Sequence, residues 1–402
     1  MTAPTAAAVV GSPGRYAEDI AAYREALRSY LAGIDWADEW RHPSTSTAEG
    51  MRHDTAVLQR LFEAGWNRYG WPVEAGGLGG DVLHRAVYYE ELAYAMLPVP
   101  AQQWTLEVLA PVLLDIAPEL AQQHLPKYLD GSQWWGQCFS EPEAGSDLAT
   151  LRTKAVADGD GGYVISGQKI WTSQGPGASR FLVLARTGAP DSRHRGLTTF
   201  MVEADAPGVT VRPIALASGR EEIAEVFFDD VHVGPERVIG DIDAGWSVVM
   251  FLMQFERGMY GYASLTKALT ELGQLRVDLI TRGCTQSERD RFTRTYLNVA
   301  AAQARCAGTV RALAAGIHVG PASSVDKLLA SHAEREAFDL IFEMRQDWLI
   351  GSGFQGAEDG AELGLARAEW WYSRAATVMG GTAEVQRGII ADHLLGLPKE
   401  KR

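Results

Sequence analysis

Residues 138–147 read CFSEPEAGSD, and residues 167–175 read GQKIWTSQG. Each segment starts as an extended run and ends in a turn rich in Gly, Pro and hydroxyl side chains. Such turns leave backbone N–H groups and Ser hydroxyls free to bind a ligand. A large flat side chain, Trp171, lies in the second segment. The two segments therefore predict a cradle for a planar ligand, with two ordinary strand-turn units as the alternative.

The composition is that of a globular chain. It has 402 residues, 46% of them hydrophobic and 22% charged, which predicts two or three packed regions. A net charge of −14 argues against a nucleic-acid surface. The first residues lack a signal-peptide pattern, and no apolar run reaches the roughly 20 residues that span a bilayer. The three cysteines and nine histidines show no metal spacing, so we expect a cytoplasmic protein without a metal site.

The hydrophobic pattern changes twice along the chain. Apolar residues recur at helical spacing from residue 16 to about residue 129, and again from residue 245 onward. Between them, short β-prone runs such as residues 163–166 and 181–184 are separated by Gly, Asp and Pro. The order predicts an α+β multi-domain chain, with a helical domain at 1–130, a β domain at 131–240 and a helical domain at 241–402.

Three motifs carry a resemblance to the acyl-CoA dehydrogenase family. They are the two segments above and the run GGTAEVQRGII at 380–390, which continues to LGLP at 395–398. The resemblance covers roughly residues 20–399. It implies an N-terminal helical domain, a middle β-barrel and a C-terminal four-helix bundle, with FAD bound between the last two and reaching a neighbouring subunit. A homodimer or homotetramer is implied, and a hetero-oligomer is left open.

The chemistry of this family needs a carboxylate base, and Glu256 is the candidate. On the helix predicted from about Trp246, apolar or aromatic residues lie one turn before and one turn after it: Leu252, Met253, Met259 and Tyr260. A solvated helix glutamate usually shares its face with polar residues, so we expect Glu256 to point into an apolar interior or pocket. The alternative is a buried structural carboxylate paired with an arginine from another helix.

The resemblance also places the base at one of two positions that meet in space. The first reads FERG at 255–258, and the second reads MGGT at 379–382, where Gly380 stands in place of the Glu of the commoner group. This implies Glu256 as the base, as in isovaleryl and long-chain members. It implies that the Gly380 N–H and a flavin ribityl hydroxyl bind the thioester carbonyl oxygen. Glu384 is a rival base, but a first-turn position in a helix capped by Thr382 explains it better.

The remaining site residues are implied by the same resemblance. Arg257, Ser146 and Gly381 match substrate-contacting positions, although Arg257 is equally well explained as a solvated helix arginine. The segment near residues 288–292 lacks the usual arginine motif for the FAD pyrophosphate, and Arg289, Arg291 or Arg294 could replace it. The residues implied to bind FAD are Phe139, Ser140, Gly145, Ser146, Trp171, Thr172, Ser173, Thr382 and Glu384.

The sequence thus predicts an FAD-dependent enzyme of lipid metabolism that dehydrogenates an acyl thioester between its α and β carbons. The thioester could be carried by CoA or by an acyl-carrier protein, and electrons would pass to an electron-transfer flavoprotein or a similar acceptor. Two alternatives stay open. One is a flavin monooxygenase or oxidase on the same fold. The other is a non-catalytic subunit of a hetero-oligomeric dehydrogenase, and the altered arginine segment near residues 288–292 is the observation that motivates it.

Overall fold

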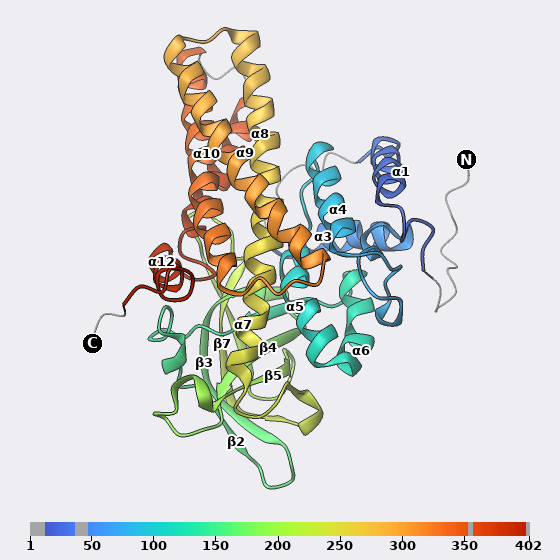
Figure 1. The fold of residues 1–402 in the computed structure, drawn as a ribbon, viewed down its shortest axis with the longest axis vertical. Helices are drawn as coiled ribbons and strands as arrows, with labels where there is room; N and C mark the ends of the chain where they lie inside the picture. The colour runs from blue at the N-terminus through green and yellow to red at the C-terminus, as the bar shows by residue number, and fades with distance from the viewer. Residues whose placement is uncertain (1–12, 37–46, 353–356, 399–402) are drawn as a thin grey trace. The chain divides into compact units, whose positions relative to one another are not determined.

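The computed structural model describes residues 13–36, 47–352 and 357–398 (Figure 1). Within these ranges the chain forms two compact units. The first takes its described residues from Met1–Glu18, Ser44–Gly80 and Pro100–Phe255, and the second from Asp19–Pro43, Asp81–Val99 and Glu256–Arg402. The helical, strand and helical order predicted from the sequence is confirmed. The described strands run from Trp135 to Ile239, and the domain boundaries at 130 and 240 stay predictions.

The first unit contains an open β-sheet. Its strand order is β6-β7-β3-β2-β4-β5-β8, and β1 pairs in parallel with β4. The end strands β6 and β8 do not pair with each other in the described part of the chain, so the predicted closed barrel is wrong. The strands are β1 Trp135–Cys138, β2 Lys154–Ala157, β3 Tyr163–Ser173, β4 Arg180–Arg186, β5 Leu197–Glu203, β6 Val209–Ile214, β7 Ile223–Val233 and β8 Val238–Ile239.

Helices of the same unit build a core with this sheet. The helices are α3 Thr47–Glu63, α5 Gln102–Ile116, α6 Pro118–Leu129 and α7 Gly245–Phe255. Pro118 opens α6, where its missing N–H costs no helical hydrogen bond. Leu109 of α5, Leu125 of α6 and Leu252 of α7 are fully buried in one hydrophobic cluster with residues of β4 and β5. The same cluster contains Trp135 of β1 and Phe139 and Ala144, so this burial also holds the 138–147 segment against the helices.

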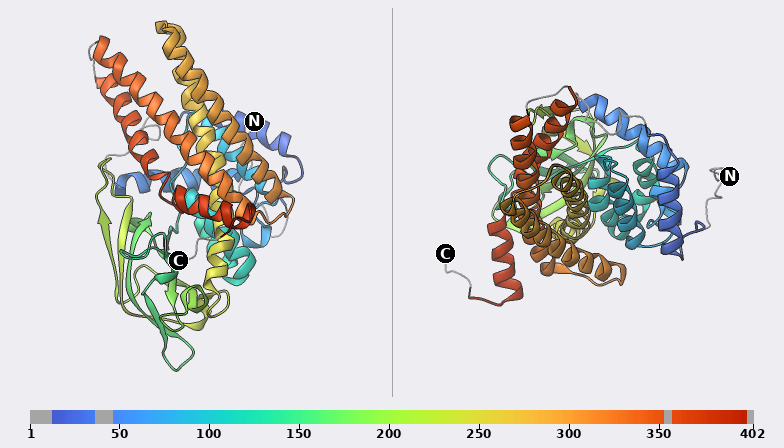
Figure 2. Two further views of the ribbon diagram at one scale, coloured as in Figure 1. Left: turned by 60° about the vertical axis from the view of Figure 1, so that its left-hand side comes forward. Right: turned by 90° about the horizontal axis from the view of Figure 1, so that it is seen from above.

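The second unit is a helical bundle, as predicted. The long helices α8 Gly261–Arg282, α9 Gln286–Ala314 and α11 Ala357–Ala375 each pack against α10 Ser323–Ser352 (Figures 1 and 2). Thr285 and Glu288 form a capping box at the start of α9. The unit also holds α1 Ile20–Ala32, α4 Val82–Tyr94 and the short α12 Ala383–Ile389.

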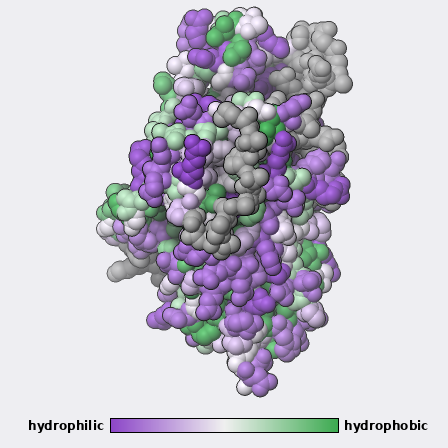
Figure 3. Space-filling view, turned by 90° about the vertical axis from the view of Figure 1, so that its right-hand side faces the viewer, coloured by the Kyte–Doolittle hydropathy of each residue, from purple (hydrophilic) through white to green (hydrophobic). Residues whose placement is uncertain are grey.

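The molecular surface in Figure 3 is largely hydrophilic, with hydrophobic residues in small separate groups. Among the described residues, no helix has the length and apolar character needed to cross a membrane.

Candidate active site

In the first unit the two predicted cradle segments lie side by side. The Ile170 N–H donates to the Ser140 carbonyl oxygen at 3.0 Å, and Cys138 Sγ lies 3.4 Å from Thr172 Oγ1. Glu141 and Ala144 exchange backbone hydrogen bonds of 3.1 and 3.0 Å, which closes the turn after β1. The segments are therefore joined by backbone and side-chain contacts along their length.

A buried ion pair also joins the segments, and the sequence reasoning missed it. Lys169 is fully buried, and its Nζ donates to the Phe139 carbonyl oxygen and to Glu141 Oε1, both at 2.9 Å. Glu141 also accepts from the backbone N–H groups of Arg152 and Thr153, at 2.6 and 2.8 Å. Burial alone would raise the carboxyl pKa, but the Lys169 ammonium and these N–H groups outweigh it and lower the pKa of Glu141.

A signal for Lys169 was present in the sequence. Lys169 lies four residues after buried Ile165 in a β-prone run, and residues four apart on a strand share a face. A lysine on the buried face of a strand requires a buried partner, because an isolated ammonium is costly to remove from water. The nearby Glu141 of the first motif is the acidic residue that answers this requirement.

Trp171 has an unusual backbone conformation. Its φ is +63°, in the left-handed region that bulky residues rarely adopt, and the β3–β7 register breaks between Lys169 and Thr172. Its side chain is nonetheless 57% exposed. Strained backbone that holds an aromatic ring in solvent is typical of a ligand-binding position. The observation fits a planar cofactor beside the indole.

The other predicted cofactor residues of this unit fall into two groups. Gly145, Ser146 and Ser173 are exposed, and in the described structure neither serine hydroxyl has a hydrogen-bond partner. A methyl group at Gly145 would meet no atom within 4 Å, so a ligand can approach its backbone closely. The side chains of Phe139 and Thr172 are instead buried, which leaves their backbone for contact with a cofactor. These residues fit a flat cofactor with polar appendages.

In the second unit, Glu256 lies at the start of a π-helical turn. The helix predicted from about Trp246 is found as α7, which begins at Gly245 and ends at Phe255, and the π-helix Glu256–Tyr260 joins it to α8, which begins at Gly261. π-Helical turns occur frequently at functional sites. A methyl group at Gly258 would lie 2.9 Å from Thr309 Cγ2 of α9, so a glycine permits the close packing here.

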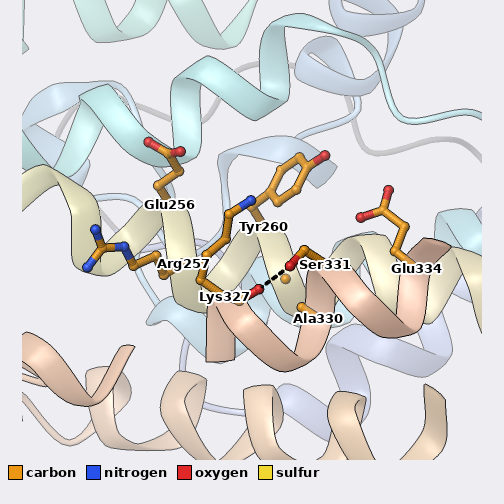
Figure 4. A pocket seen from close by; sticks show the side chains of 8 residues that line it. Glu256, Arg257, Tyr260, Lys327, Ala330, Ser331 and Glu334 are labelled. Carbon is orange, nitrogen blue, oxygen red and sulfur yellow. Dashed lines mark hydrogen bonds between the residues drawn. The ribbon is translucent and has the colours of Figure 1, made fainter. Parts of the chain in front are cut away.

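Glu256 lines a small cavity of about 10 Å³, roughly the room that one water molecule needs (Figure 4). Of the residues expected around Glu256, Tyr260 lines this cavity and Leu252, Met253 and Met259 do not, and five of the eight lining residues carry polar or charged side chains. The polar groups come largely from α10, which is distant in sequence and could not enter a periodicity argument over residues 252–260. The lining residues are Glu256, Arg257, Tyr260, Gly261, Lys327, Ala330, Ser331 and Glu334.

The carboxylate of Glu256 meets the Gly-Gly turn that precedes α12. Gly380 has φ +66°, and a methyl group built on it would lie 2.2 Å from Oε1 of Glu256. Glu256 is partly exposed and has no hydrogen-bond or ion-pair partner among the described residues, so the alternative of an arginine-paired structural carboxylate is not found there. The Gly380 N–H likewise has no acceptor in the described part of the chain. A carboxylate and a backbone N–H, neither with a hydrogen-bond partner among the described residues, therefore lie close together at this turn.

Gln386 holds this turn and was missed by the sequence reasoning. It is fully buried, and its Nε2 donates to the carbonyl oxygens of Gly380 and Gly381 at 3.1 and 3.2 Å. Thr382 caps α12 as predicted, because its Oγ1 accepts from the Val385 N–H at 3.3 Å. Glu384 is exposed in the first turn, where its own backbone N–H and the Thr382 hydroxyl lower its pKa. These contacts agree with the capping interpretation of Glu384.

The predicted arginines lie in different surroundings. Arg257 is 8% exposed, and its Nη1 donates to Ser324 Oγ at 3.2 Å, so it is not a solvated helix arginine. Arg291 forms an ion pair with Glu343. Arg289 and Arg294 are exposed on α9 with no ion-pair partner among the described residues, and they stay candidates for the FAD pyrophosphate. No group of His, Cys, Asp or Glu that could hold a metal occurs in the described ranges.

Comparison with known proteins identifies the family of this chain. Acyl-CoA dehydrogenase family models match with the N-terminal domain at residues 18–132, the middle domain at 136–231 and the C-terminal domain at 243–395. Acyl-CoA dehydrogenase IpdE1 of Mycobacterium tuberculosis is 35% identical over 394 residues, covering 96% of this chain and 100% of that protein.

Two solved structures share the fold across nearly the whole chain. The steroid ACAD Tcur3481-Tcur3483 has a TM-score of 0.81 and 25% identity, covering 95% of this chain and 98% of that one. The ChsE4-ChsE5 complex from Mycobacterium tuberculosis has a TM-score of 0.76 and 26% identity, covering 96% of this chain and 99% of that one. The chain therefore belongs to the acyl-CoA dehydrogenase family, whose members are FAD-dependent oxidoreductases that dehydrogenate acyl thioesters.

Proposed function

We propose that Glu256 is the base that removes the α-proton of the acyl thioester in this dehydrogenase. The observation that carries the proposal is the partner-free carboxylate of Glu256 facing Gly380, where a methyl group would lie 2.2 Å from Oε1. A general base must be free to accept a proton within hydrogen-bond reach of its substrate. Glu384 does not meet this requirement equally well, because it is engaged in the first turn of α12.

Three residues of the site have separate roles in the reaction. The Gly380 N–H binds the thioester carbonyl oxygen and stabilises the negative charge that develops there while Glu256 takes the α-proton. Gln386 holds the carbonyl oxygens of Gly380 and Gly381 and so restrains the turn that carries that N–H. FAD, when bound, would supply the acceptor for the hydride of the β-carbon.

Other residues would hold the cofactor. Trp171, Ser146 and Ser173 present an exposed ring and free hydroxyls to FAD, and the Lys169–Glu141 pair keeps their two segments together. Arg257 lies in the cavity lining beside Glu256, and we propose that it acts on substrate indirectly, through packing against Ser324 of α10.

The test is the variant Glu256→Gln, with Glu384→Gln as its control. The Glu256 variant should stay folded and yellow, while flavin reduction by a reactive acyl thioester slows on the order of a hundredfold or more. In its FAD-loaded form Glu384→Gln should keep the wild-type rate of flavin reduction, since Glu384 is exposed, and any loss of FAD from this variant would report its implied cofactor contact instead. Undiminished reduction in Glu256→Gln would contradict the proposed base. A chain that purifies without colour would favour the non-catalytic subunit, and rapid reoxidation of reduced flavin by air would favour an oxidase.

We further propose that the enzyme works in a complex with a second acyl-CoA dehydrogenase-like chain, and that it passes electrons to an electron-transfer flavoprotein or a similar acceptor. The ChsE4-ChsE5 complex, a solved relative, supports a mixed assembly. The mass of the purified chain in solution, alone and after coexpression with such a chain, tests this. One of the similar structures is a steroid ACAD. The thioesters tested as substrates should therefore include steroid-derived thioesters as well as straight-chain CoA and carrier-protein thioesters. The three free thiols suit a cytoplasmic location.

A further inference from the structure

Lys327 is a buried lysine in the cavity of Glu256. It lies on α10 and is 8% exposed, and its Nζ donates to the Ala376 carbonyl oxygen at 2.8 Å. A methyl group at Gly380 would lie 3.5 Å from Lys327 Cε and 2.2 Å from Glu256 Oε1, so both side chains approach the same point. Figure 4 shows the Lys327 ammonium between the two carboxylates of the cavity, Glu256 and Glu334.

The electrostatic surroundings of Lys327 are unusual for a structural lysine. Burial lowers its pKa, Glu256 and Glu334 act in the opposite direction, and the neighbouring Arg257 guanidinium lowers it further. No ion pair within 4 Å compensates the Lys327 charge among the described residues. An apolar residue would pack here without the cost of removing an ammonium from water. Packing alone therefore does not explain a lysine at this position.

The contact with Ala376 links Lys327 to the Gly-Gly turn. Ala376 directly follows α11 and precedes Gly380 by four residues, so the Lys327 ammonium restrains the chain that enters the turn. Gln386 restrains the same turn from α12 through the carbonyl oxygens of Gly380 and Gly381. Two buried donors from two different helices thus fix the backbone that faces Glu256.

We propose that Lys327 is a positioning residue of the dehydrogenation, whose ammonium holds the Gly380 turn and the Glu256 carboxylate in register with each other. The proposal rests on the role of Glu256 proposed above. It predicts that Lys327 contributes to the rate of proton removal and not to the affinity for the thioester, because its ammonium is directed to Ala376 and the cavity carboxylates. A displacement of reacting groups by about 1 Å can cost a hundredfold in rate.

The test compares Lys327→Met, Lys327→Arg and a matched control, Lys267→Met. Lys267 also joins a bundle helix to α11, through an ion pair with Glu369 at 2.7 Å, but it does not line the cavity. In Lys327→Met, flavin reduction at saturating thioester should fall to about a tenth to a hundredth of the wild-type rate. Its thioester dissociation constant should stay within about threefold, Lys327→Arg should recover part of the rate, and Lys267→Met should match the wild type.

A rate within about twofold of wild type in Lys327→Met, or an equal loss in Lys267→Met, would overturn the proposal. If Lys327→Met does not fold, Lys327→Gln is measured instead, because its amide keeps a donor for the Ala376 carbonyl oxygen and removes the charge. Wild-type reduction in folded Lys327→Gln would also overturn it. The role of Glu256 is tested apart from this: a fully active Glu256→Gln refutes both proposals, whereas an inactive Glu256→Gln with an active Lys327→Met refutes only this one.

Discussion

Replacing Gly380 by alanine should slow proton removal far more than it destabilises the fold. The added methyl group would lie 2.2 Å from Oε1 of Glu256, whereas ordinary contacts begin near 3.4 Å, so the carboxylate must retreat by about 1 Å. An alanine at φ +66° also costs about 1–2 kcal/mol of backbone strain. The strain lowers stability, and the displacement acts on the base itself.

The expected rate follows from the displacement. A shift of about 1 Å in a catalytic group costs about a hundredfold in rate, or roughly 3 kcal/mol of activation free energy. The assay is anaerobic stopped-flow bleaching of the flavin at saturating thioester. Gly316→Ala is the matched control, since it has a similar φ of +70° and its methyl group would meet no atom within 4 Å.

Both variants should lose comparable stability, measured as melting temperature, and both should retain FAD. Gly380→Ala alone should lose about a hundredfold in reduction rate. If Gly380→Ala reduces its flavin within about threefold of the wild-type rate, then the carboxylate is not held against this turn during catalysis. If Gly316→Ala is slowed as much as Gly380→Ala, then backbone strain, and not displacement of Glu256, accounts for the loss.

Two further predictions concern stability. Glu141→Gln leaves the buried Lys169 ammonium without its counter-charge, so it should lower the free energy of unfolding in urea by about 3 kcal/mol and weaken FAD retention. Glu143→Gln, whose ion pair with a surface arginine is exposed, should lower it by less than about 1 kcal/mol. Equal losses would contradict the structural role of the buried pair. Burial raises the pKa of Asp326 to about 6, above the unfolded value near 3.9, despite the Thr309 hydroxyl and Arg305. The folded state then binds the proton of Asp326 more tightly than the unfolded state does. The contribution of Asp326 to stability should therefore fall by up to about 3 kcal/mol as pH rises from about 4 to 6. Asp326→Asn should flatten that part of the profile of unfolding free energy against pH.

The cradle could be predicted from the sequence because its determinants are local. The turn residues that follow Cys138 and surround Trp171 lie within two short segments, and the hydrogen bond from the Ile170 N–H to the Ser140 carbonyl oxygen joins the segments. The open edge of the sheet could not be predicted. Closure depends on pairing between β6 and β8, which lie at opposite ends of the strand order and share no sequence signal.

Glu256 could be proposed as the base from the sequence, but the polar residues around it could not be predicted. The expectation of an apolar face at Glu256 assumed a period of 3.6 residues through residues 252–260, and the π-helical turn breaks that period at Glu256. Residues before and after the turn therefore cannot be assigned to one face by periodicity. Lys327 and Glu334 enter the cavity from α10, about seventy residues later, and only tertiary packing places them there.

The geometry at Gly380 explains why one chain carries one base. The family resemblance implies a carboxylate at either the Glu256 or the Gly380 position, and the structure brings both positions to one point. Because even a methyl group at Gly380 would overlap the Glu256 carboxylate, a side chain at 380 would displace that carboxylate from its present position. Glycine at 380 therefore suits Glu256 in two ways: it leaves room for the carboxylate, and it adopts the left-handed backbone of the turn without strain.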